Sequence, residues 1–167
     1  MSRRPRVVWA DDEPKRMPYE ARLIKRAGWE LVWATSVIEA GRLLERGVFD
    51  ALLLDQMMPY YGSVPDAREV WGGCLLLRWL AGTNAPSHAP TRWGEPEKSL
   101  ERRMRLSDFE PQEPNRSIPV MVLSGYYDED VLRAMREVRP DITVHSKPIQ
   151  LDRVLAFLAE HLPGGGG

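Results

Sequence analysis

The chain contains 167 residues, of which 43% are apolar, and it has one cysteine and a formal net charge of −1. This length favours one domain and lets a fold bury roughly 70% of the surface that the unfolded chain exposes. The near-neutral charge gives no electrostatic argument for binding nucleic acid, and a single cysteine excludes an internal disulfide framework or a thiolate metal cluster. The apolar run before Asp11 is too short for a signal peptide, and no run approaches about 18 apolar residues, so we expect a cytoplasmic protein that does not enter the membrane.

Apolar segments alternate with amphipathic segments through the first third of the chain. The predicted elements are strands over 6–10, 29–34 and 50–55 and helices over 14–27 and 37–46. Gly28 stands where the first helix would end, and Ser36 with Glu39 three residues later forms a capping box for the second. The near-continuous apolar run over 50–55 is typical of a strand that is covered on both faces.

The same alternation continues in the second half. Here we expect strands over 118–124 and 142–146 and helices over 70–80, 128–138 and 149–162. The pair Gly72-Gly73 weakens the start of the helix over 70–80, because glycine disfavours helix. Five strand–helix units in series predict an α/β fold with a doubly wound, five-stranded parallel sheet of order 2-1-3-4-5, flavodoxin-like, with helices on both faces.

We expect one domain over residues 1–163 and a flexible glycine tail over 164–167. Residues 81–117 do not fit the alternation: they show no strong periodicity, contain five prolines and have balanced charges. A short helix around 97–106, with Pro96 at its start, is one possibility within this segment. Such a long connection is either functional or a tolerated insertion, and the composition does not separate the two.

Polar residues follow four of the five predicted strands. They are Asp11 and Asp12 after the first strand, Asp55 at the third, Ser124 at the fourth and Lys147 at the fifth. Because parallel strands end at the same edge of a sheet, these side chains should share one pocket. Three close carboxylates repel one another, and Mg²⁺ with its preference for oxygen ligands relieves the conflict. A carboxylate can also attack phosphorus, so the set predicts a Mg²⁺-assisted phosphoryl acceptor with Asp55 attacking.

Each of these residues also has a plain structural interpretation. Asp12 could cap the first helix, and Asp55 could belong to a turn. Ser124 could cap the helix that begins near residue 128, and Lys147 could extend its ammonium to solvent. For any one residue taken alone, the structural interpretation is at least as good as a role in a shared pocket. Five such residues, at the ends of four strands and in order, favour the shared pocket.

The sequence resembles the receiver domain of two-component response regulators. The pieces that carry the resemblance are residues 7–13 (VVWADDE), 53–59 (LLDQMMP), 118–125 (IPVMVLSG) and the Lys147-Pro148 pair. The resemblance implies that Asp55 is the phosphoacceptor and that Asp12 binds Mg²⁺ directly. It further implies that Asp11 acts through water or as a helper, that the Met57 carbonyl is another ligand, and that the Lys147-Pro148 bond is often cis. Ser124 would be the switch hydroxyl, and the Lys147 ammonium would pair with the phosphate.

The function that this resemblance implies is a phosphorylation-dependent signalling switch in a two-component phosphorelay. A histidine kinase or phosphotransfer protein would donate the phosphoryl group to Asp55, and an unknown downstream protein would read the result, without direct binding to nucleic acid or membrane. The chain would not be an enzyme beyond self-catalysed phosphotransfer and autodephosphorylation. One alternative is a pseudo-receiver, a protein-interaction module whose output does not depend on phosphorylation. A haloacid-dehalogenase-type hydrolase is disfavoured, because Met57 stands where that class needs a second aspartate.

The sequence departs from the family pattern in three places. Residues 60–72 and 81–117 hold insertions that flank the third helix. Val144 stands three residues before Lys147, where the family usually has a tyrosine or phenylalanine that changes rotamer. Tyr126, two residues after Ser124, could shade the phosphate and slow its hydrolysis. These departures put the usual aromatic coupling in doubt and favour the pseudo-receiver alternative.

Overall fold

The computed structural model describes residues 3–61, 71–82, 105–125 and 129–163. Five parallel strands form one sheet in the order β2-β1-β3-β4-β5. Their bounds are β1 Arg6–Ala10, β2 Glu30–Ala34, β3 Ala51–Asp55, β4 Val120–Ser124 and β5 Thr143–Ser146. The predicted doubly wound, flavodoxin-like α/β fold is therefore confirmed.

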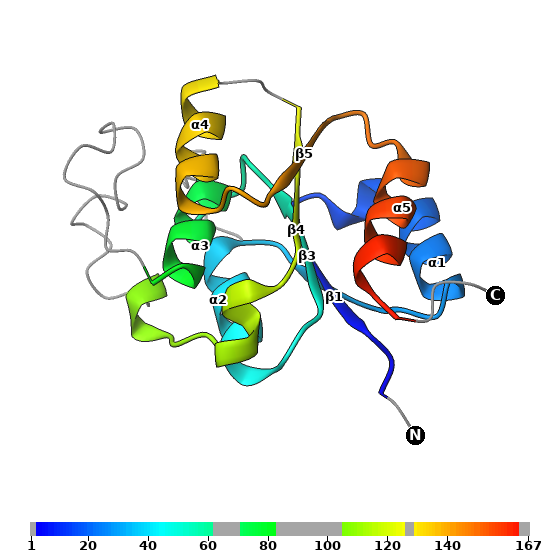
Figure 1. The fold of residues 1–167 in the computed structure, drawn as a ribbon, viewed down its shortest axis with the longest axis horizontal. Coiled ribbons are helices and arrows are strands. Elements are labelled where there is room, and N and C mark those ends of the chain that lie inside the picture. Colours follow the sequence, from blue (N-terminus) through cyan, green and yellow to red (C-terminus); the bar gives the residue numbers. More distant parts are fainter. Residues whose placement is uncertain (1–2, 62–70, 83–104, 126–128, 164–167) are drawn as a thin grey trace.

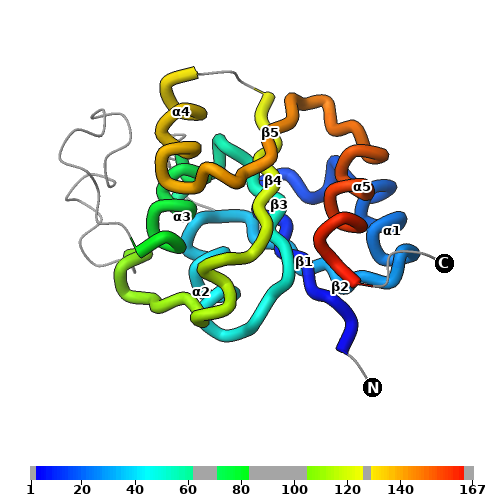
Figure 2. The backbone as a smooth tube through the Cα atoms, in the orientation of Figure 1, coloured from blue at the N-terminus to red at the C-terminus, as the bar shows by residue number. Residues whose placement is uncertain are grey.

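Within the described residues, five α-helices cover the two faces of this sheet. Their bounds are α1 Pro18–Arg26, α2 Val37–Arg46, α3 Gly72–Leu80, α4 Glu129–Val138 and α5 Leu151–His161. Helices α2, α3 and α4 lie on one face and α1 and α5 on the other (Figure 1). The tube view shows the same two layers on either side of the strands (Figure 2). Within the described ranges, no helix is long and apolar enough to cross a membrane.

Two hydrophobic clusters, one on each face, explain why the central strands of the sheet are apolar over almost their whole length. Val8, Leu52 and Leu54 point into the larger cluster together with residues of α2, α3 and α4. Trp9 and Leu53 point the other way, into the cluster that α1 and α5 share. All five residues of β3 and of β4 are buried. Because successive side chains enter opposite clusters, the central strands β3 and β4 need apolar residues at nearly every position.

The predicted helix over 14–27 is divided in two. A 3-10 turn over Pro14–Arg16 precedes α1, which starts at Pro18. Proline has no amide hydrogen, so Pro18 cannot continue a helix from Pro14, but it is well suited to a first helical position. The prediction was therefore wrong over 14–17, and the turn places the residues that follow Asp12 beside the sheet edge.

The predicted capping box at the start of α2 is half confirmed. Ser36 Oγ accepts a hydrogen bond from the Glu39 amide at 3.1 Å. The Glu39 carboxylate, however, accepts from the amide and hydroxyl of Thr35, at 2.6 and 2.8 Å, instead of from the Ser36 amide. Thr35 offers two donors where Ser36 would offer one, so the reciprocal contact moves by one residue.

The end of the second predicted insertion packs across α2 and α3. Leu106 and Phe109 are buried in the larger cluster. The Leu106 amide donates to the Tyr60 hydroxyl at 2.7 Å, and the Trp79 indole donates to the Phe109 carbonyl at 3.0 Å. Residues 105–117 thus join the body of the fold. Residues 62–70 and 83–104, which include most of the predicted helix around 97–106, lie outside the described residues, as do Tyr126 and the tail over 164–167.

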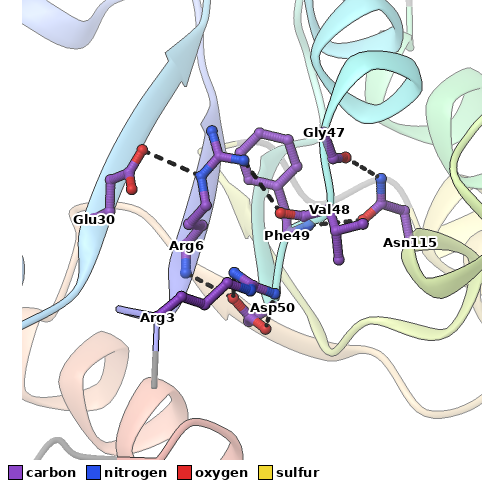
Figure 3. A network of polar contacts seen from close by, with 8 residues as sticks. All are labelled: Arg3, Arg6, Glu30, Gly47, Val48, Phe49, Asp50 and Asn115. Atoms are coloured by element: carbon purple, nitrogen blue, oxygen red, sulfur yellow. Dashed lines mark hydrogen bonds and ion pairs between the residues drawn. The ribbon is translucent and has the colours of Figure 1, made fainter. Parts of the chain in front are cut away.

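A polar network closes the amino-terminal edge of the sheet (Figure 3). The Asp50 carboxylate accepts hydrogen bonds from the Arg3 guanidinium at 2.8 and 2.9 Å and from the Arg6 amide at 2.7 Å. The Arg6 guanidinium in turn bonds Glu30 at 3.1 Å. The buried Asn115 bonds the Phe49 amide at 2.9 Å and the carbonyls of Leu44 and Gly47. This network satisfies backbone groups where the strands begin.

Candidate functional site

Three aspartates meet at the carboxyl edge of the sheet. Asp11 and Asp12 follow β1, and Asp55 is the last residue of β3. One carboxylate oxygen from each can be chosen so that all three lie within 4.8 Å of one another. Asp11 and Asp55 are buried, whereas Asp12 is exposed. The structure therefore brings together the three carboxylates that the sequence places at the ends of two different strands.

Lys147 completes this cluster from β5. Its Nζ donates to Asp11 Oδ2 at 2.9 Å and to Asp55 Oδ2 at 3.1 Å. The ammonium therefore bridges two carboxylates instead of extending to solvent. With three carboxylates and one ammonium, the cluster has a formal charge of −2 when all four groups are ionised. A divalent cation is the simplest way to balance such a charge.

The protonation properties of the cluster reflect its burial. Burial raises the pKa of Asp55 to about 6; the Asp11 charge adds to the rise, and Lys147 and the Met57 amide oppose it. Burial and the Asp11 charge also raise the pKa of Asp12. For Lys147, burial lowers the pKa, but Asp55 and Asp11 outweigh it, so the net shift is upward. Asp55 is thus costly to ionise in the bare site, and a bound cation would favour its charged form.

The aspartates do not act as helix caps. No side chain caps the 3-10 turn at Pro14 or the start of α1. Asp11 Oδ1 accepts from the Glu13 amide at 2.9 Å, and Asp55 Oδ1 accepts from the Met57 amide at 3.2 Å. These two bonds fix the carboxylates within their own loops and leave them directed at the shared space.

Ser124 ends β4 and contacts a residue that the sequence analysis did not single out. Its Oγ donates to Oε1 of Gln56, a fully buried residue that follows Asp55. The Ser124 carbonyl accepts from the Lys147 amide at 2.8 Å, and the Lys147-Pro148 bond is cis, as the resemblance implied. The signal for Gln56 was available, because a polar amide directly after a buried apolar run needs a partner.

The two glycines that start α3 allow that helix to approach the site. A Cβ on Gly73 would lie 2.5 Å from the Asp55 carbonyl oxygen, and one on Gly72 would overlap the Met58 carbonyl. The Gly73 amide donates to the Gln56 carbonyl at 3.2 Å. Helix propensity predicted only that Gly72 and Gly73 weaken the helix. It did not predict that glycine is needed here because the start of α3 lies in close contact with the turn that follows Asp55.

The ligand set suits a magnesium ion. Mg²⁺ prefers oxygen ligands, and it is usually held by one or two carboxylates with waters completing the shell. Asp11, Asp12 and Asp55 offer such oxygens, and the turn at Met57 stands beside Asp55. A cavity of about 570 Å³ opens next to Asp12 and is lined by residues 12–16 with Thr35 and Pro59.

Val144 occupies its expected position on β5. It pairs with Val122 of β4, and its half-buried side chain packs on the larger hydrophobic cluster. Valine fills this place as a packed aliphatic group, so an aromatic rotamer change cannot occur there. Trp71 and Cys74 are buried, and Trp79 is partly buried against the larger cluster.

No protein-family model and no curated protein matches this sequence. Solved structures do match its fold. A signal receiver domain of a signal transduction histidine kinase from Syntrophus aciditrophicus has a TM-score of 0.63 at 19% identity, covering 96% of this chain and 91% of that chain. The chemotaxis protein CheY4 of Vibrio cholerae has a TM-score of 0.61 at 14% identity, covering 96% and 100%.

A third structure holds ligands of interest. It is a response regulator from Burkholderia pseudomallei with a phosphorylated aspartic acid, a calcium ion and citrate, with a TM-score of 0.57 at 16% identity, covering 96% of this chain and 68% of that chain. Identities this low establish a shared fold and leave activity open. The chain therefore has the fold of response regulator receiver domains.

Proposed function

We propose that this protein is a phosphorylation-dependent signalling switch that accepts a phosphoryl group on Asp55. The observation that carries the proposal is the cluster of three carboxylates around the Lys147 ammonium at the carboxyl edge of a receiver fold. The phosphoryl group would come from a histidine kinase or phosphotransfer protein of a two-component phosphorelay. A downstream protein in the cytoplasm would read the phosphorylated state.

In this reaction an Asp55 oxygen forms a bond to phosphorus as the bond from phosphorus to the donor nitrogen or oxygen breaks. The electron pair of that bond goes to the donor, which takes up a proton if it is an imidazole. Mg²⁺, when bound, would neutralise charge on the transferring phosphoryl oxygens. Asp11, Asp12, Asp55 and the Met57 carbonyl are the groups that would hold it.

The chain's own residues supply the remaining charge and orientation. Lys147, already bonded to Asp55, can pair its ammonium with a phosphoryl oxygen, and the Ser124 hydroxyl can donate to another. The Met57 amide orients the attacking carboxylate at 3.2 Å. Catalysis would be limited to this phosphotransfer and to the hydrolysis of the acyl phosphate. The new charge, held by groups from β4 and β5, would bias the surface that these strands and α4 form.

The test is phosphorylation of the purified chain by acetyl phosphate with Mg²⁺, followed by Phos-tag electrophoresis. Wild type should give a retarded band that chelation of Mg²⁺ prevents. Asp55→Asn should give none, and the exposed Asp152→Asn on α5 should behave like wild type. A folded wild-type protein that is never modified, or modification that survives Asp55→Asn, would contradict the assignment.

A second candidate is the pseudo-receiver, favoured by Val144 in place of the aromatic residue and by the packing of residues 105–117 across α2 and α3. In that case the interaction surface would be the same with or without a phosphoryl group. Pull-down of partners by wild type and Asp55→Asn, each with and without beryllofluoride, separates the two functions. A switch requires that beryllofluoride change the captured partners for wild type alone.

A further inference from the structure

Gln56 stands between Asp55 and Ser124, and the proposed phosphotransfer does not use it. It is fully buried, and its Oε1 accepts the hydrogen bond from Ser124 Oγ. Its Nε2 is buried as well and has no hydrogen-bond partner among the described residues. A half-satisfied amide in the interior is unfavourable, and such groups often have a functional reason.

The backbone of Gln56 is held on both sides. Its amide donates to the Leu123 carbonyl of β4 at 3.4 Å, and its carbonyl accepts from the Gly73 amide of α3 at 3.2 Å. A Cβ on Gly73 would lie only 3.0 Å from the Gln56 Cα, so the two backbones are already in contact. Gln56 therefore cannot withdraw from Ser124 by a small backbone shift.

The Ser124 hydroxyl is the group for which Gln56 and a phosphoryl oxygen on Asp55 would compete. Its residue is fully buried and is anchored through its carbonyl, which accepts from the Lys147 amide at 2.8 Å. A serine hydroxyl carries one hydrogen and so donates to one acceptor at a time. When it donates to Gln56, it cannot donate to a phosphoryl oxygen on Asp55. When it turns to the phosphoryl group, Gln56 Oε1 is left without that donor in a buried place, which is costly.

Resting on the proposed function, we propose that Gln56 is a positioning residue that holds the Ser124 hydroxyl away from the phosphoryl site. It favours the unphosphorylated state by competing with the phosphoryl oxygen for one hydrogen. Removing the amide oxygen should release the hydroxyl and tighten binding of a phosphoryl group, with no change in how the aspartates bind Mg²⁺.

The experiment measures, by calorimetry at saturating Mg²⁺, how tightly the intact chain binds beryllofluoride, which mimics a phosphoryl group. Four proteins form a double-mutant cycle: wild type, Gln56→Met, Ser124→Ala and the double variant. Methionine matches glutamine in length and has no amide oxygen. Gln56→Met should bind beryllofluoride about three- to tenfold tighter than wild type, the range expected for one buried hydrogen bond. With Ser124→Ala in place, the same change should have an effect within about twofold, because no hydroxyl remains to be held.

If Gln56 had only a structural role, Gln56→Met would alter folding or Mg²⁺ affinity, and its effect would be the same with and without the Ser124 hydroxyl. Mg²⁺ affinity without beryllofluoride should be equal in wild type and Gln56→Met. Equal or weaker beryllofluoride binding by Gln56→Met, or the same gain with and without the Ser124 hydroxyl, overturns the proposal while the phosphoacceptor function stands. If folded wild type and Gln56→Met both bind Mg²⁺ but neither binds beryllofluoride, the proposed function fails and this inference with it. Gln56→Leu provides a second variant without the amide if Gln56→Met does not fold.

Discussion

The two edges of the sheet use the same kinds of side chain in opposite ways. At the amino-terminal edge, Arg3 and Arg6 face Asp50 and Glu30, so positive and negative charges are equal in number (Figure 3). At the carboxyl edge, the Lys147 ammonium bonds Asp11 and Asp55, and the carboxylate of Asp12 lies beside these two. Burial and repulsion there raise the pKa of Asp55 to about 6. The first edge is satisfied by the chain itself, whereas we propose that a cation or a phosphoryl group from outside completes the second.

This difference predicts how substitutions at each edge change the stability of the fold. A group at the balanced edge contributes to stability, and its removal should cost free energy at any pH. At the unbalanced edge, Asp55 opposes folding when it is ionised, so its replacement by a neutral residue should increase stability while abolishing the proposed function. Opposite signs for substitutions at the two ends of the same sheet are the most direct check of the comparison.

The largest expected effect belongs to Asn115. Asn115→Ala removes the partners of the Phe49 amide and of the Leu44 and Gly47 carbonyls. Leaving buried backbone groups unsatisfied should lower the free energy of unfolding by about 3 kcal/mol. Urea denaturation followed by circular dichroism measures this loss, which should be similar at pH 5 and pH 8. A loss below about 0.5 kcal/mol, the level of an ordinary surface change, would show that the amino-terminal edge does not depend on this residue.

The next effect has the opposite sign. The pKa of Asp55 rises from its ordinary value of 3.8 to about 6 on folding, because burial makes ionisation harder in the folded chain. Wild type should therefore lose stability as the pH rises from about 4 to 6, and the loss should persist above that range. In the absence of divalent cations, Asp55→Asn should be more stable than wild type by up to about 3 kcal/mol at pH 8. Near pH 4 the two proteins should unfold together, and a destabilised Asp55→Asn at pH 8 would contradict the unbalanced charge.

A third prediction concerns competition between protons and metal. Because the pKa of Asp55 is about 6, most of this carboxylate is protonated at pH 5 and most is ionised at pH 7. Mg²⁺ affinity should fall about tenfold from pH 7 to pH 5, since a ligand must lose its proton to bind. Calorimetric titration at both pH values measures the change. Affinity that is constant across this range would remove Asp55 from the set of ligands.

The smallest effect is expected at the outer part of the balanced edge. The side chain of Arg3 is 51% exposed, and Asp50 keeps its bond to the Arg6 amide when Arg3 is replaced. Arg3→Gln should change the free energy of unfolding by at most about 0.5 kcal/mol, as is usual for exposed ion pairs. Thermal unfolding at low and high salt would detect a larger role, and a loss above 1 kcal/mol would mean that this pair is less screened than its exposure suggests.

The strands and the converging aspartates were predictable for a simple physical reason. A strand buried on both faces needs a continuous apolar run, and β3 and β4 show this pattern plainly. Once five such strands are parallel, their carboxyl ends must share an edge. Asp11, Asp55 and Lys147 were therefore placed together without knowledge of any contact. The roles assigned to them stay predictions until phosphorylation is measured.

Other features depend on contacts that periodicity does not describe. The pairing of Ser124 with Gln56 joins residues from two strands, and no local pattern specifies which polar groups meet. The helical pattern predicted one helix through Pro18, although this residue has no amide hydrogen and the helix is divided there. Gly72 and Gly73 were judged by helix propensity, whereas close backbone approach decides what stands at these positions.

The approach of Gly73 to Asp55 has a mechanical consequence. Gly73 places no side chain of its own between the start of α3 and the carbonyl of Asp55, where an added Cβ would be only 2.5 Å away. Side chains normally absorb small displacements by changing rotamer, and this junction has none to do so. We therefore expect that a displacement of the Asp55 backbone toward α3 would move the whole helix in the same direction.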